Sequence, residues 1–355
     1  MTAIRPFVFP GLRSRVIFGF GTIARTAAEI AKLGRARSLV LSTPNQKTDA
    51  EALAQRLGGL CVGVFADAAM HTPVHVTELA LTIFHERHAD CVVALGGGST
   101  TGLGKAIAIR TGADQVVIPT TYAGSEMTDI LGETVGGEKT TRRDPAILPE
   151  TVIYDVDLTM SLPTSLTVTS GLNAMAHAAE ALYAPDRNPV ISLLASEGIR
   201  ALASALPQVS ANPGAREARE PALYGAWLCG VALGGASMAL HHKLCHTLGG
   251  SFDMPHSETH AVVLPHSIGF NAAAAPELLA PVSVALGASP AVALFDFAAR
   301  LGAPTTLKEL GMCEADLDRA ADIAAKSPYS NPRPFDRASI RALLQEAWEG
   351  TRPKH

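Results

Sequence analysis

The stretch that decides the fold is CVVALGGGSTTGLGK, residues 91–105. Its apolar run, 91–95, predicts a strand buried on both faces of a sheet. The three glycines at 96–98 and the hydroxyl residues after them predict a turn that opens a helix. Backbone N–H groups of such a turn can approach a ligand closely, and the helix N-terminus adds partial positive charge. The stretch therefore predicts a pyrophosphate-binding turn in a parallel α/β sheet.

This turn matches neither of the two common phosphate-binding motifs. Ala106 follows Gly104-Lys105 and Ser99 stands where a P-loop begins with glycine, while Thr101 takes the third glycine position of G-x-G-x-x-G. A turn that only packs helix against strand is the alternative. A second hydroxyl-rich turn, PTTYAGSEMT at 119–128, follows the next predicted strand. Because carboxyl ends of neighbouring parallel strands form a ligand crevice, the two turns together favour binding.

Outward from this turn, short β-branched runs alternate with Ala-rich amphipathic stretches, which is typical of a parallel α/β sheet. Beyond residue 157 the patterns are almost exclusively helical. We expect a mostly parallel α/β nucleotide-binding domain over 1–158 and an all-α domain over 159–355. The predicted strands are 16–18, 38–41, 61–65, 91–95, 115–118 and 151–155, and the predicted helices of the second half include 164–183, 189–206 and 339–348.

The composition excludes several classes of protein. Of 355 residues, 47% are apolar and 17% charged, which argues against disorder, and a net charge of −4 without basic runs argues against nucleic acid. Five scattered cysteines without C-x-x-C, and an N-terminus interrupted by Pro6 and Pro10, favour a cytoplasmic protein. The charge-free run Ala222–Leu240 is long enough for a membrane span, but its Ala, Gly and Ser content favours a domain core.

The helical half contains a group of possible ligands on mostly apolar segments, where each polar side chain needs a partner. Two pairs have the i, i+4 spacing that puts both members on one helix face. A lone histidine is more often a satisfied core residue, but several at this spacing predict a site. The candidates are Asn173, His177, His241, His242, His246, His256 and His260.

With these residues the chain resembles the iron-containing alcohol dehydrogenase superfamily, which shares its fold with glycerol dehydrogenase and dehydroquinate synthase. The resemblance covers essentially the whole chain and implies an active site in a cleft between the two domains. In metal-dependent members a D-x-x-x-H pair and two later histidines bind a divalent ion. Here those positions are Asn173, His177, His242 and His256. Asparagine removes the only anion, so we expect these positions to be vestigial and a metal not to be required.

Five motifs resemble one branch in particular, the maleylacetate reductases: GGGSTTGLGKA, PTTYAGSEMT, EKTTRRDPAILPETVIYD, SGLNAMAHAAEALYA and HHKLCHTLGGSFDMPH. One further departure from the metal-dependent enzymes is Gly102, where they usually carry aspartate. This resemblance implies reduction of the carbon–carbon double bond of 2-maleylacetate to 3-oxoadipate, with NADH or NADPH, in the degradation of aromatic compounds. It also implies a homodimer.

The expected roles follow from this reaction, because hydride addition to the enone leaves an enolate oxygen that needs preorganised donors. Arg142 or Arg143 is a further candidate cation for the substrate, and no acid follows the second strand to select NADH. The expected catalytic residues are His177, His242, His246 and His256, with His246 or His242 as the proton donor. The expected substrate contacts are Asn173, His241, Lys243 and Tyr122. The expected cofactor contacts are Ser42, Thr43, Gly96, Gly97, Gly98, Ser99, Thr120, Thr121, Ser125 and, by resemblance, Lys139 at the nicotinamide ribose.

Three alternatives stay open. A metal-dependent alcohol or polyol dehydrogenase would need a divalent ion, against which Asn173 argues. A lyase like dehydroquinate synthase would need basic residues for a phosphate, of which the histidine segment holds only Lys243. A non-catalytic nucleotide sensor would bind NADH without oxidising it.

Overall fold

A computed structural model describes residues 6, 7, 9, 11, 13–136, 138–326 and 329–354, without the side chains of residues 138 and 139. The chain forms two compact units, an α/β unit over Pro10–Leu162 and a helical unit over Pro163–His355, which includes the described residues among the first nine. The division lies 162 − 158 = 4 residues after the predicted boundary. Each unit is described by itself.

The α/β unit contains a six-stranded sheet in the order β1-β8-β5-β4-β2-β3, and every neighbouring pair is parallel. The predicted α/β fold class is confirmed, and each of the six predicted strands is present. The strands are β1 (Arg15–Gly19), β2 (Ser38–Leu41), β3 (Cys61–Phe65), β4 (Cys91–Gly96), β5 (Asp114–Pro119) and β8 (Thr151–Asp155).

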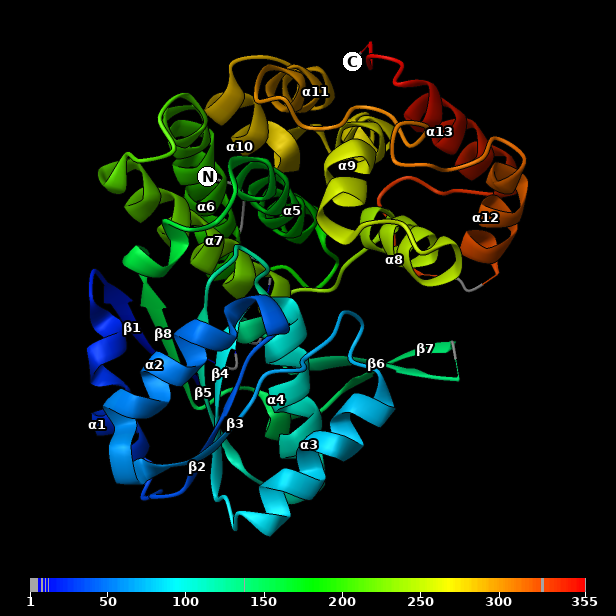
Figure 1. Ribbon diagram of the computed structural model, residues 1–355. Coiled ribbons are helices and arrows are strands. Elements are labelled where there is room, and N and C mark those ends of the chain that lie inside the picture. The colour runs from blue at the N-terminus through cyan, green and yellow to red at the C-terminus, as the bar shows by residue number, and fades with distance from the viewer. Residues whose placement is uncertain are drawn as a thin grey trace. The chain divides into compact units, whose positions relative to one another are not determined.

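Helices cover both faces of this sheet (Figure 1). Val93 and Leu95 of β4 pack on the side of α1 (Thr26–Lys32) and α2 (Lys47–Leu57). Val92 packs on the opposite side, with residues of α3 (Val74–Glu86) and α4 (Gly98–Thr111). This alternation within one strand explains why its sequence is a continuous apolar run.

The strand order reverses between β2 and β4. From β2 the chain continues to its neighbour β3, whereas from β4 it continues to β5 on the other side. At such a reversal the two loops leave in opposite directions and open a crevice at the carboxyl ends of the strands. The glycine turn after β4 and the Ser42-Thr43 pair after β2 both lie at this edge.

The sequence reasoning missed an antiparallel hairpin, β6 (Ile130–Val135) and β7 (Glu138–Arg143). Its strands are rich in Thr, Glu and Arg, so they lack the apolar runs from which the other strands were predicted. The available signal was the glycine pair at 136–137 between two stretches of β-forming residues. The sheet prediction was therefore incomplete at this point.

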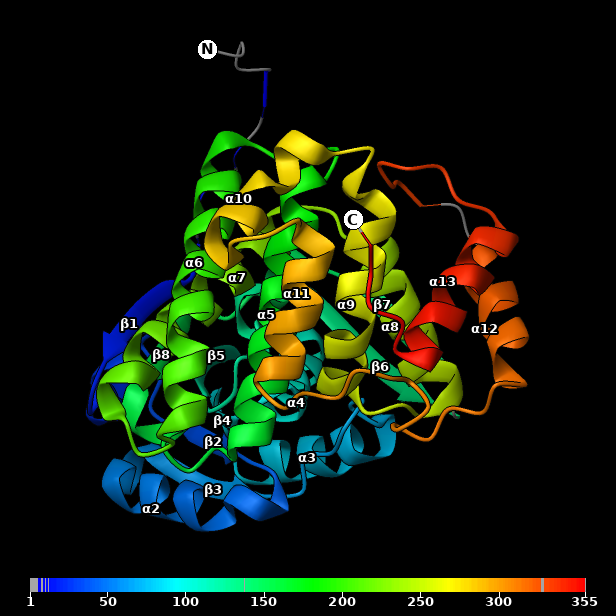
Figure 2. The same ribbon diagram turned by 90° about the horizontal axis from the view of Figure 1, so that it is seen from above.

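The regular structure in the described part of the helical unit is all α-helical, as predicted (Figure 2). One core cluster joins residues of the last two helices to those of α8 and α9. The helices are α5 (Thr164–Tyr183), α6 (Pro189–Ala211), α7 (Arg216–Gly235), α8 (Leu240–Phe252), α9 (His256–Ala272), α10 (Pro276–Leu286), α11 (Pro290–Arg300), α12 (Asp316–Ala325) and α13 (Arg337–Glu349).

The charge-free run Ala222–Leu240 is not one helix, because α7 ends at Gly235 and α8 begins at Leu240 with a bend of 97°. By length and composition two other stretches of the described residues could cross a membrane, Pro189–Ala211 and Pro276–Arg300, or three if the bent pair counts as one span. α6 packs against α5, α7 and α10, so protein surrounds much of its apolar surface.

Candidate functional site

The glycine turn after β4 is tight because other side chains press against its backbone. A Cβ at Gly96 would overlap Thr100 Oγ1 and lie 2.8 Å from Gln46 Oε1, and one at Gly97 would lie 2.9 Å from Thr121 Oγ1. Gly96 also has φ +153°, which only glycine adopts readily. The turn is thus a backbone surface surrounded by hydroxyl and amide groups.

Several of the surrounding hydroxyls make no hydrogen bond with protein. Among the described residues, Ser42 Oγ, Thr100 Oγ1 and Ser125 Oγ are buried without a partner. The first N–H groups of α4 also have no acceptor within the helix, since Thr101 N is the first to bond back, to Gly97 O. The N–H donors that begin α4, with Ser125 Oγ beside the exposed Gly98, fit a ligand rich in phosphate and ribose oxygens.

The other predicted cofactor residues differ in how far they are exposed. Gly98 is exposed and Ser99 half-buried at the start of α4, and Thr43 is half-buried after β2. Ser42 and Thr100, by contrast, have no exposed surface, so their side chains cannot themselves touch the cofactor in this conformation. Thr120 Oγ1 accepts a hydrogen bond from Gln46 Nε2 at 2.8 Å.

Two predicted contacts in this unit receive no support from the structure. The side chain of Lys139 lies outside the described residues, so its predicted contact with the nicotinamide ribose stays a prediction. Tyr122 is fully buried in the α/β unit and presents no surface to a substrate.

Lys105, in α4, organises the loop that carries Ser125. Its Nζ donates to the carbonyls of Ser125, Thr128 and Ile130 and to Thr128 Oγ1 at 2.6–2.9 Å, and only 1% of the residue is exposed. Burial lowers the pKa of Lys105 to about 7, an effect that Glu126 and Asp129 oppose. The Lys105 amine therefore fixes the loop at residues 125–130 beside the glycine turn.

Arg142 and Arg143, the candidate substrate cations of the hairpin, already have carboxylate partners. Arg142 pairs with Glu133 at 2.9 Å and Arg143 with Asp129 at 2.9 Å. Glu133 is also bound by Arg110 at 2.8 Å. These ion pairs lie within the α/β unit and stabilise the hairpin. The charges of Arg142 and Arg143 are thus already neutralised by protein carboxylates, without a substrate.

The helical unit brings the predicted histidines of three helices together. The ring centroids of His177 (α5) and His242 (α8) are 4.9 Å apart, and that of His260 (α9) is 5.2 Å from His242. His241 and His256 lie 4.8 and 4.5 Å from His260. The prediction of one cluster from dispersed segments agrees with this geometry.

A buried hydrogen-bonded chain runs through the cluster. Glu180 Oε2 is 2.6 Å from His242 Nδ1, and His242 Nε2 is 2.7 Å from His177 Nδ1. A carboxylate only accepts hydrogen bonds, so His242 carries its proton on Nδ1 and meets His177 through Nε2. Glu180, His242 and His177 thus form a carboxylate–imidazole–imidazole chain.

Glu180 also caps the start of α8. Its oxygens accept the backbone N–H groups of Ala239 at 3.0 Å and His241 at 2.8 Å. Burial raises the pKa of Glu180, but the hydrogen bond from His242 and the nearby imidazoles outweigh that effect and hold the pKa at about 2. The side chain is a carboxylate at neutral pH, although it is fully buried.

A second pair in the cluster is neutral. His241 Nε2 lies 2.9 Å from His260 Nδ1, and His241 Nδ1 lies 3.0 Å from Ser267 Oγ. Burial lowers the pKa of His241 to about 3 and that of His260 well below its usual range. His260 Nε2 and Asn173 Oδ1 are buried without a hydrogen-bond partner among the described residues.

The remaining predicted residues lie nearer the surface of the unit. His246 and His256 are exposed, with the ring of His246 5.9 Å from that of His242. Lys243 is half-buried, and its Nζ is 5.9 Å from the centre of the Tyr329 ring, within cation–π range. A carboxylate of a substrate could therefore meet Lys243 at the cost of only this weak contact.

The expected metal positions do not form a coordination site in this arrangement. His177 Nδ1 and His242 Nε2 hydrogen-bond each other at 2.7 Å, and Asn173 offers a neutral amide in place of a carboxylate. Within the described part of the chain, only His241, Cys245 and His260 have three donor atoms within 4.8 Å of one another. Those two histidines also hydrogen-bond each other, so neither set fits a divalent ion as it stands.

Sequence reasoning missed two residues that hold these sites together, Glu180 and Lys105. For Glu180 a signal existed, because 173, 177 and 180 recur at i, i+4 and i+7 and so share one face of α5. An acid on the apolar face of a helix needs a buried partner. For Lys105, the sequence analysis considered only the P-loop pattern and assigned the residue no role.

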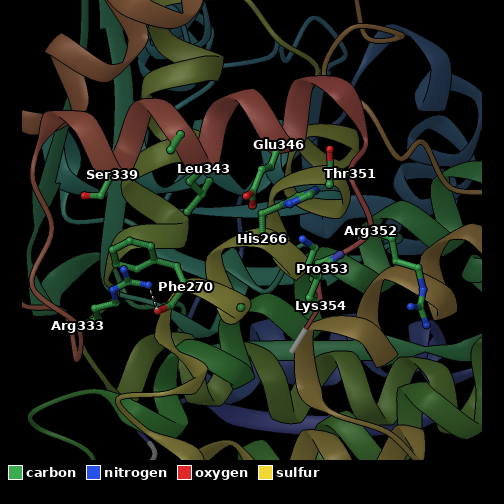
Figure 3. Close-up of a pocket in the computed structure, with 12 residues that line it drawn as sticks. His266, Phe270, Arg333, Ser339, Leu343, Glu346, Thr351, Arg352, Pro353 and Lys354 are labelled. Carbon is green, nitrogen blue, oxygen red and sulfur yellow. Dashed lines mark hydrogen bonds between the residues drawn. The ribbon is translucent and has the colours of Figure 1, made fainter.

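A cavity of about 350 Å³ lies elsewhere in the helical unit, between α9, α13 and residues 351–354 (Figure 3). Its lining includes Phe270, Leu343 and His266 but none of the clustered histidines. Both ring nitrogens of His266 are buried without a partner among the described residues, and burial lowers its pKa to about 4. No prediction was made for His266, and the cavity carries no part of the site.

Comparisons with known proteins agree with this geometry. Residues 13–156 match the model of the iron-containing alcohol dehydrogenases, and residues 167–348 match the C-terminal model of the same family. Maleylacetate reductase of Rhizobium sp. strain MTP-10005 is 60% identical, over 99% of this chain and 100% of its own length. That of Burkholderia cepacia is 54% identical, over 98% and 99%.

A crystal structure of maleylacetate reductase from Agrobacterium tumefaciens has a TM-score of 0.96 and 60% identity, covering 99% of this chain and 100% of that one. The predicted resemblance is confirmed. Since the family is named for iron, the comparisons do not support the expectation that a metal is not required. The chain belongs to the iron-containing alcohol dehydrogenase family of oxidoreductases.

Proposed function

We propose that this enzyme reduces the carbon–carbon double bond of maleylacetate to give 3-oxoadipate, with a nicotinamide cofactor as hydride donor. The observation that carries the proposal is the hydrogen-bonded chain Glu180–His242–His177, with the neutral Asn173 one helical turn before His177 on α5. Relatives named maleylacetate reductase, at 60% and 54% identity over nearly the full length, support the choice of substrate.

The glycine turn is proposed to hold the pyrophosphate of the cofactor. The unpartnered hydroxyl of the half-buried Ser125, together with the free N–H groups that begin α4, supports this role. The bound cofactor supplies the hydride. Ser42 and Thr43, the residues after β2, are uncharged, so neither a carboxylate nor a cation there selects between NADH and NADPH.

The reaction places two demands on the protein. Hydride adds to the carbon β to the ketone, and the electrons of the double bond move to the ketone oxygen as an enolate. A proton then adds to the α carbon, which restores the ketone and completes the saturated product. The protein must therefore stabilise a developing oxyanion and deliver one proton.

The Glu180–His242–His177 chain can change the hydrogen-bonding character of its outer nitrogen. When His242 is neutral, His177 donates from Nδ1, and its Nε2 is an acceptor. With one more proton on the chain, His242 donates from Nε2, and His177 carries its own proton on Nε2 as a donor. Glu180 stabilises that added positive charge. We therefore assign His177 as the donor to the enolate oxygen.

His246 is the better of the two candidate proton donors. Both ring nitrogens of His242 contact other groups, Glu180 and His177, so His242 has none left for the substrate. His246 is exposed one helical turn further along α8. We assign the transferred proton to His246, a place beside the substrate to Asn173 and His256, and a contact with a substrate carboxylate to Lys243. The predicted substrate contact of His241 is not kept, because His241 is fully buried and its two ring nitrogens meet Ser267 and His260.

We further propose that the reaction needs no metal, and that the chain acts in the cytoplasm as a homodimer. The neutral Asn173 and the contact between His177 and His242 support the first of these proposals. Three imidazole ligands without a carboxylate can hold zinc. Because the family is named for iron as well, the absence of a metal requirement is the first part of the proposal to test.

The test is NADH oxidation, followed by absorbance, with freshly prepared maleylacetate before and after exhaustive treatment with a chelator. Unchanged turnover is the expected result. Loss of turnover that iron or zinc restores would overturn the metal-free mechanism and keep the substrate. No turnover of maleylacetate, with NAD-dependent oxidation of a simple alcohol, would assign the enzyme to the metal-dependent dehydrogenases. NADH binding without oxidation by any enone would indicate a nucleotide sensor.

A further inference from the structure

We propose that Tyr183 is a positioning residue, which orients the carboxylate of Glu180 for its contact with His242. A pair of amides, those of Asn271 and Asn331, directs the hydroxyl proton of Tyr183 to that carboxylate. The proposal rests on the proposed function, because it concerns the hydrogen-bonded chain that Glu180 begins. Tyr183 lies in α5, Asn271 in α9, and Asn331 in the segment before α13, all within the helical unit.

The two oxygens of Glu180 have different partners. Oε2 accepts the Nδ1–H of His242 at 2.6 Å. Oε1 accepts the backbone N–H of His241 at 2.8 Å and the hydroxyl of Tyr183 at 3.1 Å. Tyr183 follows Glu180 by three residues and so shares its face of α5. Donors from two helices therefore hold Oε1, and a carboxylate held in this way keeps Oε2 on His242.

The Tyr183 hydroxyl keeps its proton and has one acceptor to give it to. Burial and the nearby charge of Glu180 raise the pKa of Tyr183 well above its usual value. The hydroxyl oxygen itself accepts a hydrogen bond from Asn271 Nδ2 at 3.3 Å. Because an N–H group already points at this oxygen from Asn271, the hydroxyl proton turns to Glu180 Oε1.

The amide of Asn271 is fixed in the orientation that donates to Tyr183. Asn271 Nδ2 donates to Asn331 Oδ1 at 2.9 Å, and Asn331 Nδ2 donates back to Asn271 Oδ1 at 2.7 Å. The backbone of Arg333 meets both amides, since its N–H donates to Asn271 Oδ1 at 3.4 Å and its carbonyl accepts from Asn331 Nδ2 at 2.6 Å. An inverted pair would place oxygen against that carbonyl and NH₂ against that N–H. The segment before α13 thus sets the direction of the Tyr183 proton.

The first experiment measures steady-state turnover of maleylacetate at saturating NADH. Tyr183→Phe keeps the ring and removes only the hydroxyl, and we expect about a tenfold lower kcat, the loss of one hydrogen bond to a charged group. The KM for maleylacetate and the Kd for NADH should not change. A purely structural role would lower the melting temperature and leave kcat at the wild-type value, a result that would overturn the proposal. Tyr224→Phe, in α7, is the matched control.

The second experiment asks whether Tyr183 acts through Glu180. In the Glu180→Gln background, Tyr183→Phe should lower kcat no further, because both substitutions act on the same carboxylate. Effects on kcat that multiply in the double variant would overturn the proposal.

The third experiment tests the amide pair. Asn331→Ala frees the amide of Asn271 to turn its oxygen toward Tyr183, which then donates to Asn271. We expect a kcat about two- to fivefold lower, the effect of one weakened hydrogen bond. Arg333→Ala keeps the backbone groups that fix the pair and should have the wild-type kcat. An unchanged kcat in Asn331→Ala would overturn the directing role of the pair.

Proton NMR of the enzyme without substrate separates this proposal from the proposed function. The Nδ1–H proton of His242 lies in a 2.6 Å hydrogen bond with a carboxylate and should give a downfield resonance that Glu180→Gln removes. In Tyr183→Phe this resonance should shift, because the carboxylate loses a donor while the aromatic ring stays. An unshifted resonance would overturn the role of Tyr183. The expected shift in an enzyme that does not turn over maleylacetate would overturn the proposed function alone.

Discussion

The two candidate regions use buried polar groups in opposite ways. Around the glycine turn, the hydroxyl of the half-buried Ser125 has no hydrogen-bond partner among the described residues. In the helical unit, His242 is already hydrogen-bonded to both His177 and Glu180. The first arrangement completes its hydrogen bonds only with a ligand, whereas the second fixes proton positions before a ligand arrives. The difference matches the roles proposed above, cofactor binding at the glycine turn and catalysis in the helical unit.

The largest expected effect is at Glu180. Glu180→Ala leaves His242 and the first N–H groups of α8 without their acceptor, so we expect a loss of about 3–5 kcal/mol in the free energy of unfolding. Glu180→Gln should fold better but lower kcat about 100-fold or more, because the chain loses its anion. Urea unfolding and steady-state kinetics measure the two effects.

The control is Glu197→Gln in α6, which removes a surface pair with Arg200 at 2.7 Å and should change neither quantity. A wild-type kcat in Glu180→Gln would contradict the proposal that the Glu180–His242–His177 chain fixes the proton positions needed for catalysis.

The second effect is at Lys105, which anchors the loop of the binding region. Lys105→Met leaves the carbonyls of Ser125, Thr128 and Ile130 without their donor, which should cost about 2–3 kcal/mol of stability. Because Ser125 is then less well held, the Kd for NADH should rise while kcat at saturating NADH changes little. Lys47→Met, in an exposed pair with Glu51, is the matched control. A lower kcat in Lys105→Met with an unchanged Kd for NADH would contradict the assignment of this loop to cofactor binding.

A third effect concerns pH. His266 has a folded pKa of about 4, below its ordinary value of 6.5. As pH falls through 6.5 the unfolded chain takes up the proton first, so stability is full above that pH and declines toward pH 4. For His266 this amounts to about 2 kcal/mol between pH 7 and pH 5.

The variant that tests this is His266→Phe, which replaces two unpartnered nitrogens by an apolar ring. It should lose less stability than the wild type over that pH range, as thermal or urea unfolding at both values would show. If the stability of both proteins depends on pH in the same way, the loss of stability in acid comes from the clustered histidines and not from His266.

The smallest effect is expected outside both regions. Arg352 pairs with Asp296 through two contacts of 2.7 Å, but both side chains are exposed. Arg352→Gln should therefore leave the melting temperature within experimental error at ordinary salt concentration. A clear loss would mean that surface pairs contribute to stability here on the scale of the buried ones.

The structure of the proposed binding region was largely predictable from sequence, and that of the proposed catalytic region only in part. A strand, its glycine turn and the following helix are local, so 91–105 specifies them without knowledge of the rest. The histidines were found by their i, i+4 spacing, but which nitrogen meets which depends on how three helices pack. The β6–β7 hairpin was missed because its strands lack apolar runs, and Lys105 because a charge buried by backbone carbonyls leaves no sequence pattern.

Glu180 has a consequence for how sequences of this family are compared. The same carboxylate caps α8 and holds His242, so selection for a folded protein alone would retain glutamate at this position. Its invariance among relatives would therefore say nothing about catalysis. A homologue that had lost activity would still keep the acid for as long as it kept the helix.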